Sequence, residues 1–268
     1  MLLFSFKIIL EATCPSALPI SHGRLLHGTF LNIIKKFDAP LSAELHDDQV
    51  KRFSVGILRS KIKLVRNSYN FQVGDIASWH ITCAGEDIFQ CFKNLQIGES
   101  LRVGRVEFII KNFICDSDSD ESTGFITMDT LKEVALSLPV MNKLELDFVT
   151  PTTFKYLGAE WPFPRQESIF GSLAEKWNAF SSTDSFDVEQ IKELSGSFIP
   201  VKWHGETRMV NITKDRGVLG FVGSFTYSLE LVPEEYRSLF ILLAEFSQFT
   251  GVGRLNAQGM GRVQIKYE

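Results

Sequence analysis

The chain has few cysteines, and their spacing is unlike that of the ligands of a metal site. Four are spread over 268 residues without a CxxC pair: Cys14, Cys83, Cys91 and Cys115. The five histidines add no zinc-ligand spacing around them. We therefore expect reduced core thiols in a cytoplasmic protein, and we assign the cysteines no chemistry.

Long hydrophobic runs are also missing. No stretch approaches the roughly 18 to 20 apolar residues of a membrane-spanning helix. Residues 1–10 are apolar, but they are interrupted by Lys7, lack a basic beginning and lead into Glu11, so we interpret them as a buried first strand. With 44% hydrophobic and 22% charged residues and no low-complexity tract, the chain is typical of a soluble globular protein of one or two domains.

An excess of positive charge is absent as well, since the formal net charge is -4. That total alone argues against nucleic-acid binding, which requires local positive potential. The distribution is more favourable: residues 51–66 contain Lys51, Arg52, Arg59, Lys61, Lys63 and Arg66 with no acid between them. This run is either a solvated hairpin face or a phosphate-binding strip. The serine-rich run 116–121, with Asp116, Asp118, Asp120 and Glu121, is expected to be a flexible linker or loop.

Hydrophobic periodicity predicts the same order of elements twice. The first half should contain strands at 3–10, 53–58, 62–65, 75–83 and 100–113 and helices at 23–37, 41–47 and 86–95. The second should contain strands at 143–149, 198–203, 207–212, 221–231 and 262–266 and helices at 166–180 and 233–249. We therefore predict an α+β protein with two tandem ferredoxin-like (RRM-like) domains and antiparallel sheets. The predicted domains are residues 1–120 and 143–268, joined by a linker at 121–142.

Four glycines precede the last predicted strand, as two Gly-X-Gly units separated by five residues: Gly251, Gly253, Gly259 and Gly261. The spacing is neither the GxGxxG of a dinucleotide site nor a P-loop, which needs a lysine beside its final glycine. Glycines let a backbone bend sharply and let a phosphodiester chain approach exposed N–H groups. The loop therefore indicates nucleic-acid binding.

This glycine-rich loop resembles the signature of the repeat-associated RNA-binding superfamily of CRISPR systems. Three more segments occur in the expected order, at residues 26–31 through 45–48 (Leu-His-Gly-Thr-Phe-Leu, then Leu-His-Asp-Asp), 150–154 (Thr-Pro-Thr-Thr-Phe) and 217–223. Together they resemble the CRISPR-associated endoribonuclease family that cuts precursor crRNA within its repeats, and the likeness runs from Leu3 to Tyr267. The resemblance implies cleavage without a metal or cofactor, in which a 2′-hydroxyl attacks the adjacent phosphate to give 2′,3′-cyclic phosphate and 5′-hydroxyl ends.

Such chemistry needs a base, an acid and cations near the phosphate. Histidine suits both proton-transfer roles, because its ordinary pKa lies close to neutral pH. By resemblance, His46 matches a histidine that is catalytic in many members, and His27 matches one used in a subset. Arg24 lies one helical turn before His27, and Lys51 falls where a lysine assists in some members. Some relatives carry a tyrosine on the first helix where this chain has Leu31, and the sequence assigns neither histidine to the acid or the base role.

For RNA binding, the candidates are the basic strip and the glycine-rich loop, with Arg105 and Lys111 as weaker additions. The predicted residues are Arg52, Arg59, Lys61, Lys63, Gly251, Gly253, Arg254, Gly259 and Gly261. We expect His22 to lie at the beginning of the first helix and His80 and His204 to be structural.

The expected partner is CRISPR repeat RNA in precursor crRNA, with an effector complex as a further candidate and no membrane, for a monomer or homodimer. The alternative hypothesis is a non-catalytic RNA-binding subunit of a CRISPR effector complex, which would keep the loop and the basic strip but tolerate loss of both histidines. A metal-dependent nuclease is disfavoured, because no cluster of carboxylates is spaced to hold divalent ions.

Overall fold

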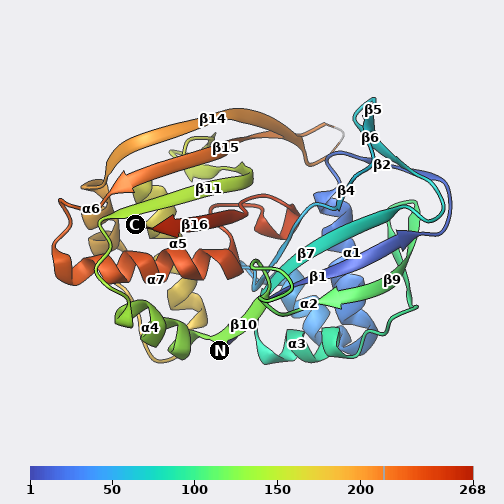
Figure 1. The fold of residues 1–268 in the computed structure, drawn as a ribbon, viewed down its shortest axis with the longest axis horizontal. Coiled ribbons are helices and arrows are strands. Elements are labelled where there is room, and N and C mark those ends of the chain that lie inside the picture. Colours follow the sequence, from blue (N-terminus) through green and yellow to red (C-terminus); the bar gives the residue numbers. More distant parts are fainter. Residues whose placement is uncertain (214, 268) are drawn as a thin grey trace. The chain divides into compact units, whose positions relative to one another are not determined.

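Two antiparallel sheets organise the chain, each in its own compact unit (Figure 1). The computed structural model describes residues 1–213 and 215–267. The N-terminal unit contains residues 2–125 together with 257–259. The C-terminal unit contains Met1, residues 126–256 and the chain from Met260 onward. Residues 257–259 of the glycine-rich loop therefore belong to the N-terminal unit.

The N-terminal unit has the ferredoxin-like order of elements. Its principal elements are β1 (Leu2–Ala12), α1 (Gly23–Phe37), α2 (Ala39–Asp47), β3 (Phe53–Val55), β7 (Ile76–Ala84), α3 (Glu86–Lys93), β8 (Ser100–Val103) and β9 (Val106–Ile114). The strands lie in the order β3-β7-β1-β9-β8, and each neighbouring pair is antiparallel. β1, β3, β7 and β9 thus serve as the four strands of a β-α-β-β-α-β unit.

Alternation along β1 decides which face of this sheet is the core. Phe4, Phe6, Ile8 and Leu10 are buried in the hydrophobic cluster of the unit, which also contains Phe30 of α1. Helix α1 contributes Leu26, Phe30, Ile33 and Ile34, three or four residues apart, as an amphipathic helix should. The ring of Phe30 stacks on that of Phe53 in β3 with 4.0 Å between centroids, which fixes α1 against the edge of the sheet.

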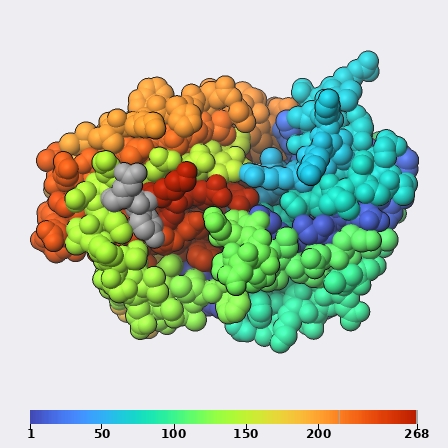
Figure 2. Space-filling model, viewed as in Figure 1, coloured from blue at the N-terminus to red at the C-terminus, as the bar shows by residue number. Residues whose placement is uncertain are grey.

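Smaller strands extend this unit. β4 (Arg59–Ser60) pairs with β7, and β2 (Ser16–Pro19), β6 (Ser68–Phe71) and β5 (Leu64–Val65) form a separate sheet in the order β2-β6-β5. The β5–β6 hairpin projects from the surface of the unit (Figures 1 and 2). Part of the predicted basic strip therefore lies on a protruding hairpin.

The C-terminal unit repeats the order. It contains β11 (Lys143–Thr152), β12 (Phe154–Tyr156), β13 (Ala159–Trp161), α5 (Gln166–Phe180), α6 (Val188–Gly196), β14 (Ile199–Asn211), β15 (Gly217–Ser228), α7 (Glu234–Thr250) and β16 (Val263–Tyr267). Its sheet has the order β14-β15-β11-β16, so the second, third, first and fourth strands of a β-α-β-β-α-β unit lie side by side. The prediction of a tandem ferredoxin-like α+β fold is confirmed.

The structure differs from the predicted elements in several places. The strands expected at 198–203 and 207–212 are one strand, β14. Neither α6 nor the β12–β13 hairpin was predicted, because these elements are short. The predicted linker, 121–142, holds β10 (Gly124–Thr127) and α4 (Met128–Ser137), because Thr127 caps the helix and Leu131 and Ala135 are buried. The domain boundaries given above stay a prediction.

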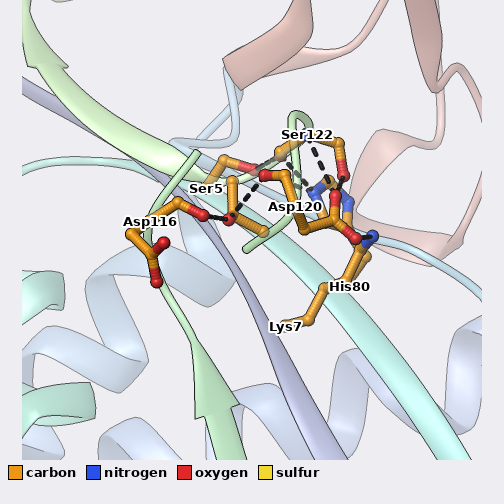
Figure 3. A network of polar contacts seen from close by, with 7 residues as sticks. Ser5, Lys7, His80, Asp116, Asp120 and Ser122 are labelled. Carbon is orange, nitrogen blue, oxygen red and sulfur yellow. Dashed lines mark hydrogen bonds and ion pairs between the residues drawn. The ribbon is translucent and has the colours of Figure 1, made fainter. Parts of the chain in front are cut away.

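The acidic run at residues 116–121 is part of a loop that is held by polar contacts (Figure 3). Asp120 pairs with Lys7 of β1, and its carboxylate also accepts from the backbone N–H of Ser122 at 3.0 Å. These contacts hold the pKa of Asp120 far below its ordinary value against the opposing effect of burial, so the carboxylate is charged whenever the protein is folded at neutral pH. The expectation of a flexible linker or loop did not include these contacts, because the partners Lys7 and Ser5 lie more than a hundred residues away in the sequence.

Among the described residues, no helix is long and apolar enough to cross a membrane. All four cysteines are free. Cys83 and Cys91 are buried, as expected of core thiols, whereas Cys14 is half-buried and Cys115 is exposed.

Candidate active site

The two predicted catalytic histidines lie together in the N-terminal unit. His27 is on α1 and His46 is in the last turn of α2, and their ring centroids are 6.2 Å apart. The turn between the helices produces this approach, because Asp38 ends α1 and caps α2 by accepting from the backbone N–H of Leu41 at 2.9 Å. Ser42 of α2 then donates to the carbonyl of Leu31 in α1 at 2.9 Å, which ties the two helices together.

His27 has a defined tautomer. Its Nδ1 lies 3.0 Å from the carbonyl oxygen of Ala257. Because a carbonyl can only accept, Nδ1 must carry the proton and the lone pair of a neutral ring must be on Nε2. The ring is half-buried and stacks on Phe53 at 5.6 Å between centroids, so its plane is held as well.

The charge state of His27 follows from the same surroundings. Burial lowers its pKa, and the positive charges of Lys51, His46 and Arg24 act in the same direction. The bond to Ala257 opposes them, because it stabilises the charged ring. The net effect is a lowered pKa, so His27 is neutral at neutral pH, whereas His46 is exposed on the surface.

Lys51 and Arg24 supply positive charge beside the histidines. Lys51 donates from Nζ to the carbonyl of Leu45 at 2.9 Å and to that of His46, both in the last turn of α2. Burial lowers the pKa of Lys51, while Asp48 and Asp47 oppose that effect. Arg24 is exposed on α1, one turn before His27. The structure thus brings together all four residues predicted as catalytic.

Arg52 has a different environment from the one expected of a phosphate ligand. Its guanidinium pairs with Glu44 at 2.7 Å, Asp87 at 2.9 Å and Asp48 at 3.6 Å, and its side chain is only 16% exposed. These carboxylates come from α2 and α3 and from the residue after α2. Arg52 therefore holds the helix that carries His46, and its charge is already balanced by acids.

The rest of the basic strip is open to solvent. Arg59, Lys61 and Lys63 are exposed in the same unit as the histidines. Arg105 is also exposed, whereas Lys111 pairs with Glu11 at 3.2 Å. In the C-terminal unit, Arg254 donates to Glu160 at 2.5 Å.

The glycine-rich loop directs many of its N–H groups inward. Gly251 donates to Ser247 and Val252 to Gly261, both at 2.7 Å, while Arg254 and Gly261 donate at 3.0 Å to carbonyls of residues 153 and 151. Gly251, Gly259 and Gly261 are buried, and Gly253 is half-buried. This arrangement differs from the exposed N–H groups that we expected the loop to offer a phosphodiester backbone.

Close packing explains these glycines instead. A Cβ on Gly261 would overlap the side-chain amide of Asn256, and one on Gly251 would come within 2.7 Å of it. In the N-terminal unit, a Cβ on Gly23 of α1 would overlap the carbonyl oxygen of Gln258, next to the Ala257 carbonyl that His27 contacts. The glycine spacing is visible in the sequence, but only the structure shows which groups occupy the space that a Cβ would need.

His22 and His80 are hydrogen-bonded within the N-terminal unit. His22 is the N-cap residue of α1 and is buried, with Nδ1 donating to the carbonyl of Pro19 and Nε2 accepting from the N–H of Leu58, both at 2.8 Å. His80 lies in the network of Figure 3, with Nε2 2.8 Å from the Ser5 hydroxyl and 3.1 Å from the Ser122 carbonyl. Since Ser5 donates to that same carbonyl, His80 is the donor to Ser5 and cannot act as its base.

We also looked for clusters of potential metal ligands among the described residues. Within residues 1–213 and 215–267, no group of three or more His, Cys, Asp or Glu side chains is placed to hold a metal ion.

Two ferredoxin-like units in one chain, with a glycine-rich loop before the final strand and a histidine pair on the first two helices, define a class of tandem α+β proteins. Comparison with known proteins shows which members of this class the chain is similar to. Residues 146–263 match the family model described as CRISPR-associated endoribonuclease Cas6. A protein of that name from Mycobacterium tuberculosis strain CDC 1551 is 31% identical over 130 residues, which are 48% of this chain and 40% of that relative.

A second relative and a solved structure agree with this match. A protein of the same name from Streptococcus thermophilus is 23% identical over 177 residues, 56% of this chain and 72% of that relative. A solved structure described as a Cas6 product complex has the same fold, with a TM-score of 0.80 at 20% identity and 99% of both chains covered. The matched segment and the two relatives agree with the resemblance recognised in the sequence, and the solved structure shows the same fold. The match of this chain covers only about two fifths of the length of the first of these relatives.

Proposed function

We propose that this protein is a metal-independent endoribonuclease that cuts CRISPR repeat RNA in precursor crRNA. The observation that carries the proposal is the pair of histidines 6.2 Å apart, one held as a neutral base and one exposed beside it. The family match supports the same activity, and solved relatives of the same fold are described as Cas6 product and substrate mimic complexes.

In the proposed reaction, His27 is the general base. Its Nε2 takes the proton from the 2′-hydroxyl, because Nδ1 is committed to the carbonyl of Ala257. The 2′-oxygen attacks the adjacent phosphorus and forms a cyclic phosphate as the bond to the 5′-oxygen breaks. His46 donates a proton to that leaving oxygen and so leaves a 5′-hydroxyl.

Two cations stabilise the charge that develops on the phosphorane. Lys51 is held beside the pair by the last carbonyls of α2, and Arg24 lies on the same helix as His27. A fixed positive charge is most effective where charge appears only in the transition state. We propose that both residues contact the scissile phosphate.

The RNA is bound mainly by the exposed part of the basic strip. We propose that Arg59, Lys61 and Lys63 contact phosphates upstream or downstream of the cut. Arg52 instead positions α2, because three carboxylates already surround it. The four loop glycines allow the chain to bend and pack closely, and they do not offer N–H groups to phosphate. Arg254 can contact RNA only if a phosphate replaces Glu160 as the partner of its guanidinium.

Single histidine substitutions test the proposal. We expect His46→Ala and His27→Ala each to slow single-turnover cleavage of repeat RNA by about 100-fold or more, the usual contribution of general acid–base catalysis. RNA affinity should stay close to that of the wild type, because neither ring is the main phosphate contact. His204→Ala is the matched control, since the His204 ring is hydrogen-bonded to Ser224 within the C-terminal unit and its loss should leave cleavage unchanged. Wild-type cleavage by His46→Ala would remove that residue from the mechanism.

A further inference from the structure

Two exposed aromatic rings lie on the β12–β13 hairpin of the C-terminal unit, and the proposed chemistry does not use them. The strands pair in antiparallel register, with Phe154 opposite Trp161. Tyr156 lies opposite Ala159 in the same register. Residues two apart in a strand point to the same side, so these four side chains share one face of the hairpin. Phe154 is buried on that face, whereas Tyr156 is 41% exposed and Trp161 is 39% exposed.

The two exposed rings contact each other beside a small residue. The centroids of Tyr156 and Trp161 are 5.6 Å apart and their planes are inclined by 57°, which makes them a diagonal cross-strand pair. Ala159 is next to both on the same face, and it is exposed. Its methyl group leaves open the space that a larger side chain would fill. The face therefore offers two ring surfaces with room beside them for a flat group.

An arginine adds positive charge to this aromatic pair. The guanidinium group of Arg165 lies over the ring of Tyr156, 5.1 Å from its centroid, and pairs with Glu167 at 3.2 Å. The cation–π contact holds the tyrosine ring in place. The pair is thus a fixed aromatic surface with a cation at its border.

The opposite face of the hairpin is polar and carries more cations. Glu160 on this face pairs with Arg254 at 2.5 Å and with Arg216 at 3.6 Å, so one carboxylate serves two guanidinium groups. Lys155 is opposite Glu160 in the register, and it is exposed. Of these four charged side chains, three are cations, although the formal net charge of the chain is -4. The hairpin and its partners therefore form a locally positive region.

We propose that the β12–β13 hairpin is a binding site for single-stranded RNA, with one base stacked on the pair formed by Tyr156 and Trp161. Proteins that hold single strands combine exposed aromatic rings, on which bases stack, with positive charge for the phosphates. Both features occur here in one short element. The local surplus of cations favours a polyanion over another protein as the occupant. That the strand is part of CRISPR repeat RNA rests on the proposed function, whereas the stacking does not.

Substitutions of the tryptophan test the site. In Trp161→Ala, we expect the Kd for a single-stranded RNA to rise about 10-fold or more, the usual loss for one stacked base. Trp161→Phe restores a ring and should recover most of the affinity. The kcat for repeat RNA at saturating concentration should not change, since neither ring takes part in the proposed proton transfers. A purely structural ring would instead lower the melting temperature of Trp161→Ala and leave its Kd unchanged.

A second variant blocks the site without removing a ring. Ala159→Ile fills the space beside the pair, and a β-branched residue suits an exposed strand position, so this variant keeps the test available if Trp161→Ala does not fold. Its Kd should rise in the same way. Phe125→Ala is the matched control, because Phe125 is an exposed ring of the N-terminal unit and its loss should leave the Kd unchanged.

Photo-crosslinking locates the base directly. A single-stranded RNA that carries 5-iodouridine is irradiated with the wild-type protein, and the linked peptide is identified by mass spectrometry. We expect crosslinks within residues 154–161, and we expect Ala159→Ile to reduce them.

The outcomes separate the two proposals. A wild-type Kd in folded Trp161→Ala and in Ala159→Ile, or crosslinks to other segments alone, would overturn the RNA site. A change from dimer to monomer in either variant, with unchanged RNA affinity, would show that the hairpin joins two copies of the chain and would overturn it as well. If the wild-type protein does not cut repeat RNA, the proposed function fails, but the hairpin crosslink and the rise in Kd still support the site.

Discussion

His27 and His46 are the same residue type in two environments, and the environment is the basis of the role that we propose for each. His27 is half-buried against Phe53 with Nδ1 on the Ala257 carbonyl, whereas His46 is exposed at the end of α2. The sequence could name both residues by resemblance. It could not assign base and acid, because the deciding carbonyl comes from a residue 230 positions away.

This difference predicts how cleavage depends on pH. A general base must be neutral, so activity falls on the acid side as its pKa is passed. Because the pKa of His27 is lowered from 6.5, the acid limb of the kcat/KM profile should lie below pH 6.5. Lys51→Gln removes a charge that lowers this pKa, so the limb should move to higher pH, whatever happens to the maximum rate.

Lys61→Gln is the control for that measurement. Lys61 is exposed in the basic strip and is not among the charges that affect His27, so its removal should weaken RNA binding at low salt without moving the limb. An acid limb that stays in place in Lys51→Gln, or moves to lower pH, would contradict the assignment of His27 as the base.

At the scale of elements, the glycine-rich loop is a packing device. The motif was interpreted as a site for a phosphodiester backbone, but residues 251, 252, 254 and 261 donate to carbonyls of the chain itself. Gly23 belongs to the same arrangement, although it lies at the beginning of α1, because a Cβ there would overlap the carbonyl of Gln258. Nothing in the spacing of the signature indicates this fifth glycine.

A pair of alanine substitutions on α1 tests the packing. Gly23→Ala should lower the free energy of unfolding by about 1–3 kcal/mol, because the new methyl group meets backbone that cannot rotate away. Gly28→Ala, on the same helix with nothing within 4 Å of its Cβ position, should instead raise it by about 0.5–1 kcal/mol through helix propensity. Urea denaturation of both variants measures the difference, and equal stabilities would show that the loop does not lie against Gly23.

Regular elements were predictable where periodicity is long. The helices at 23–37 and 166–180 have the predicted bounds, because each has a continuous apolar stripe over 15 residues. Short elements were missed: α4 and α6 have only 10 and 9 residues, and α4 lies in a stretch that we predicted as a linker. The ion pairs of Arg52 with Glu44, Asp48 and Asp87 could not be predicted either, since they depend on how α2 and α3 pack.

At the scale of the whole molecule, the repeated topology was predictable and the distribution of charge was only partly so. Both units have the strand order expected of the ferredoxin-like fold, because the order of periodic segments specifies it. The net charge of -4 conceals an exposed basic strip in the N-terminal unit, and the acidic loop in the same unit is bound to Lys7. The overall charge therefore says little about which surface can bind RNA.

The central claim is cleavage by 2′-hydroxyl attack without a metal, and one measurement tests it most directly. The purified protein is incubated in excess EDTA with CRISPR repeat RNA and, in parallel, with the same RNA carrying one 2′-deoxy nucleotide directly upstream of the cut. We predict a single cut in EDTA, an upstream product ending in 2′,3′-cyclic phosphate, and no cut in the deoxy substrate. Tight binding without cleavage would favour a non-catalytic RNA-binding subunit, and cleavage that EDTA abolishes or that the deoxy substitution leaves intact would contradict the mechanism.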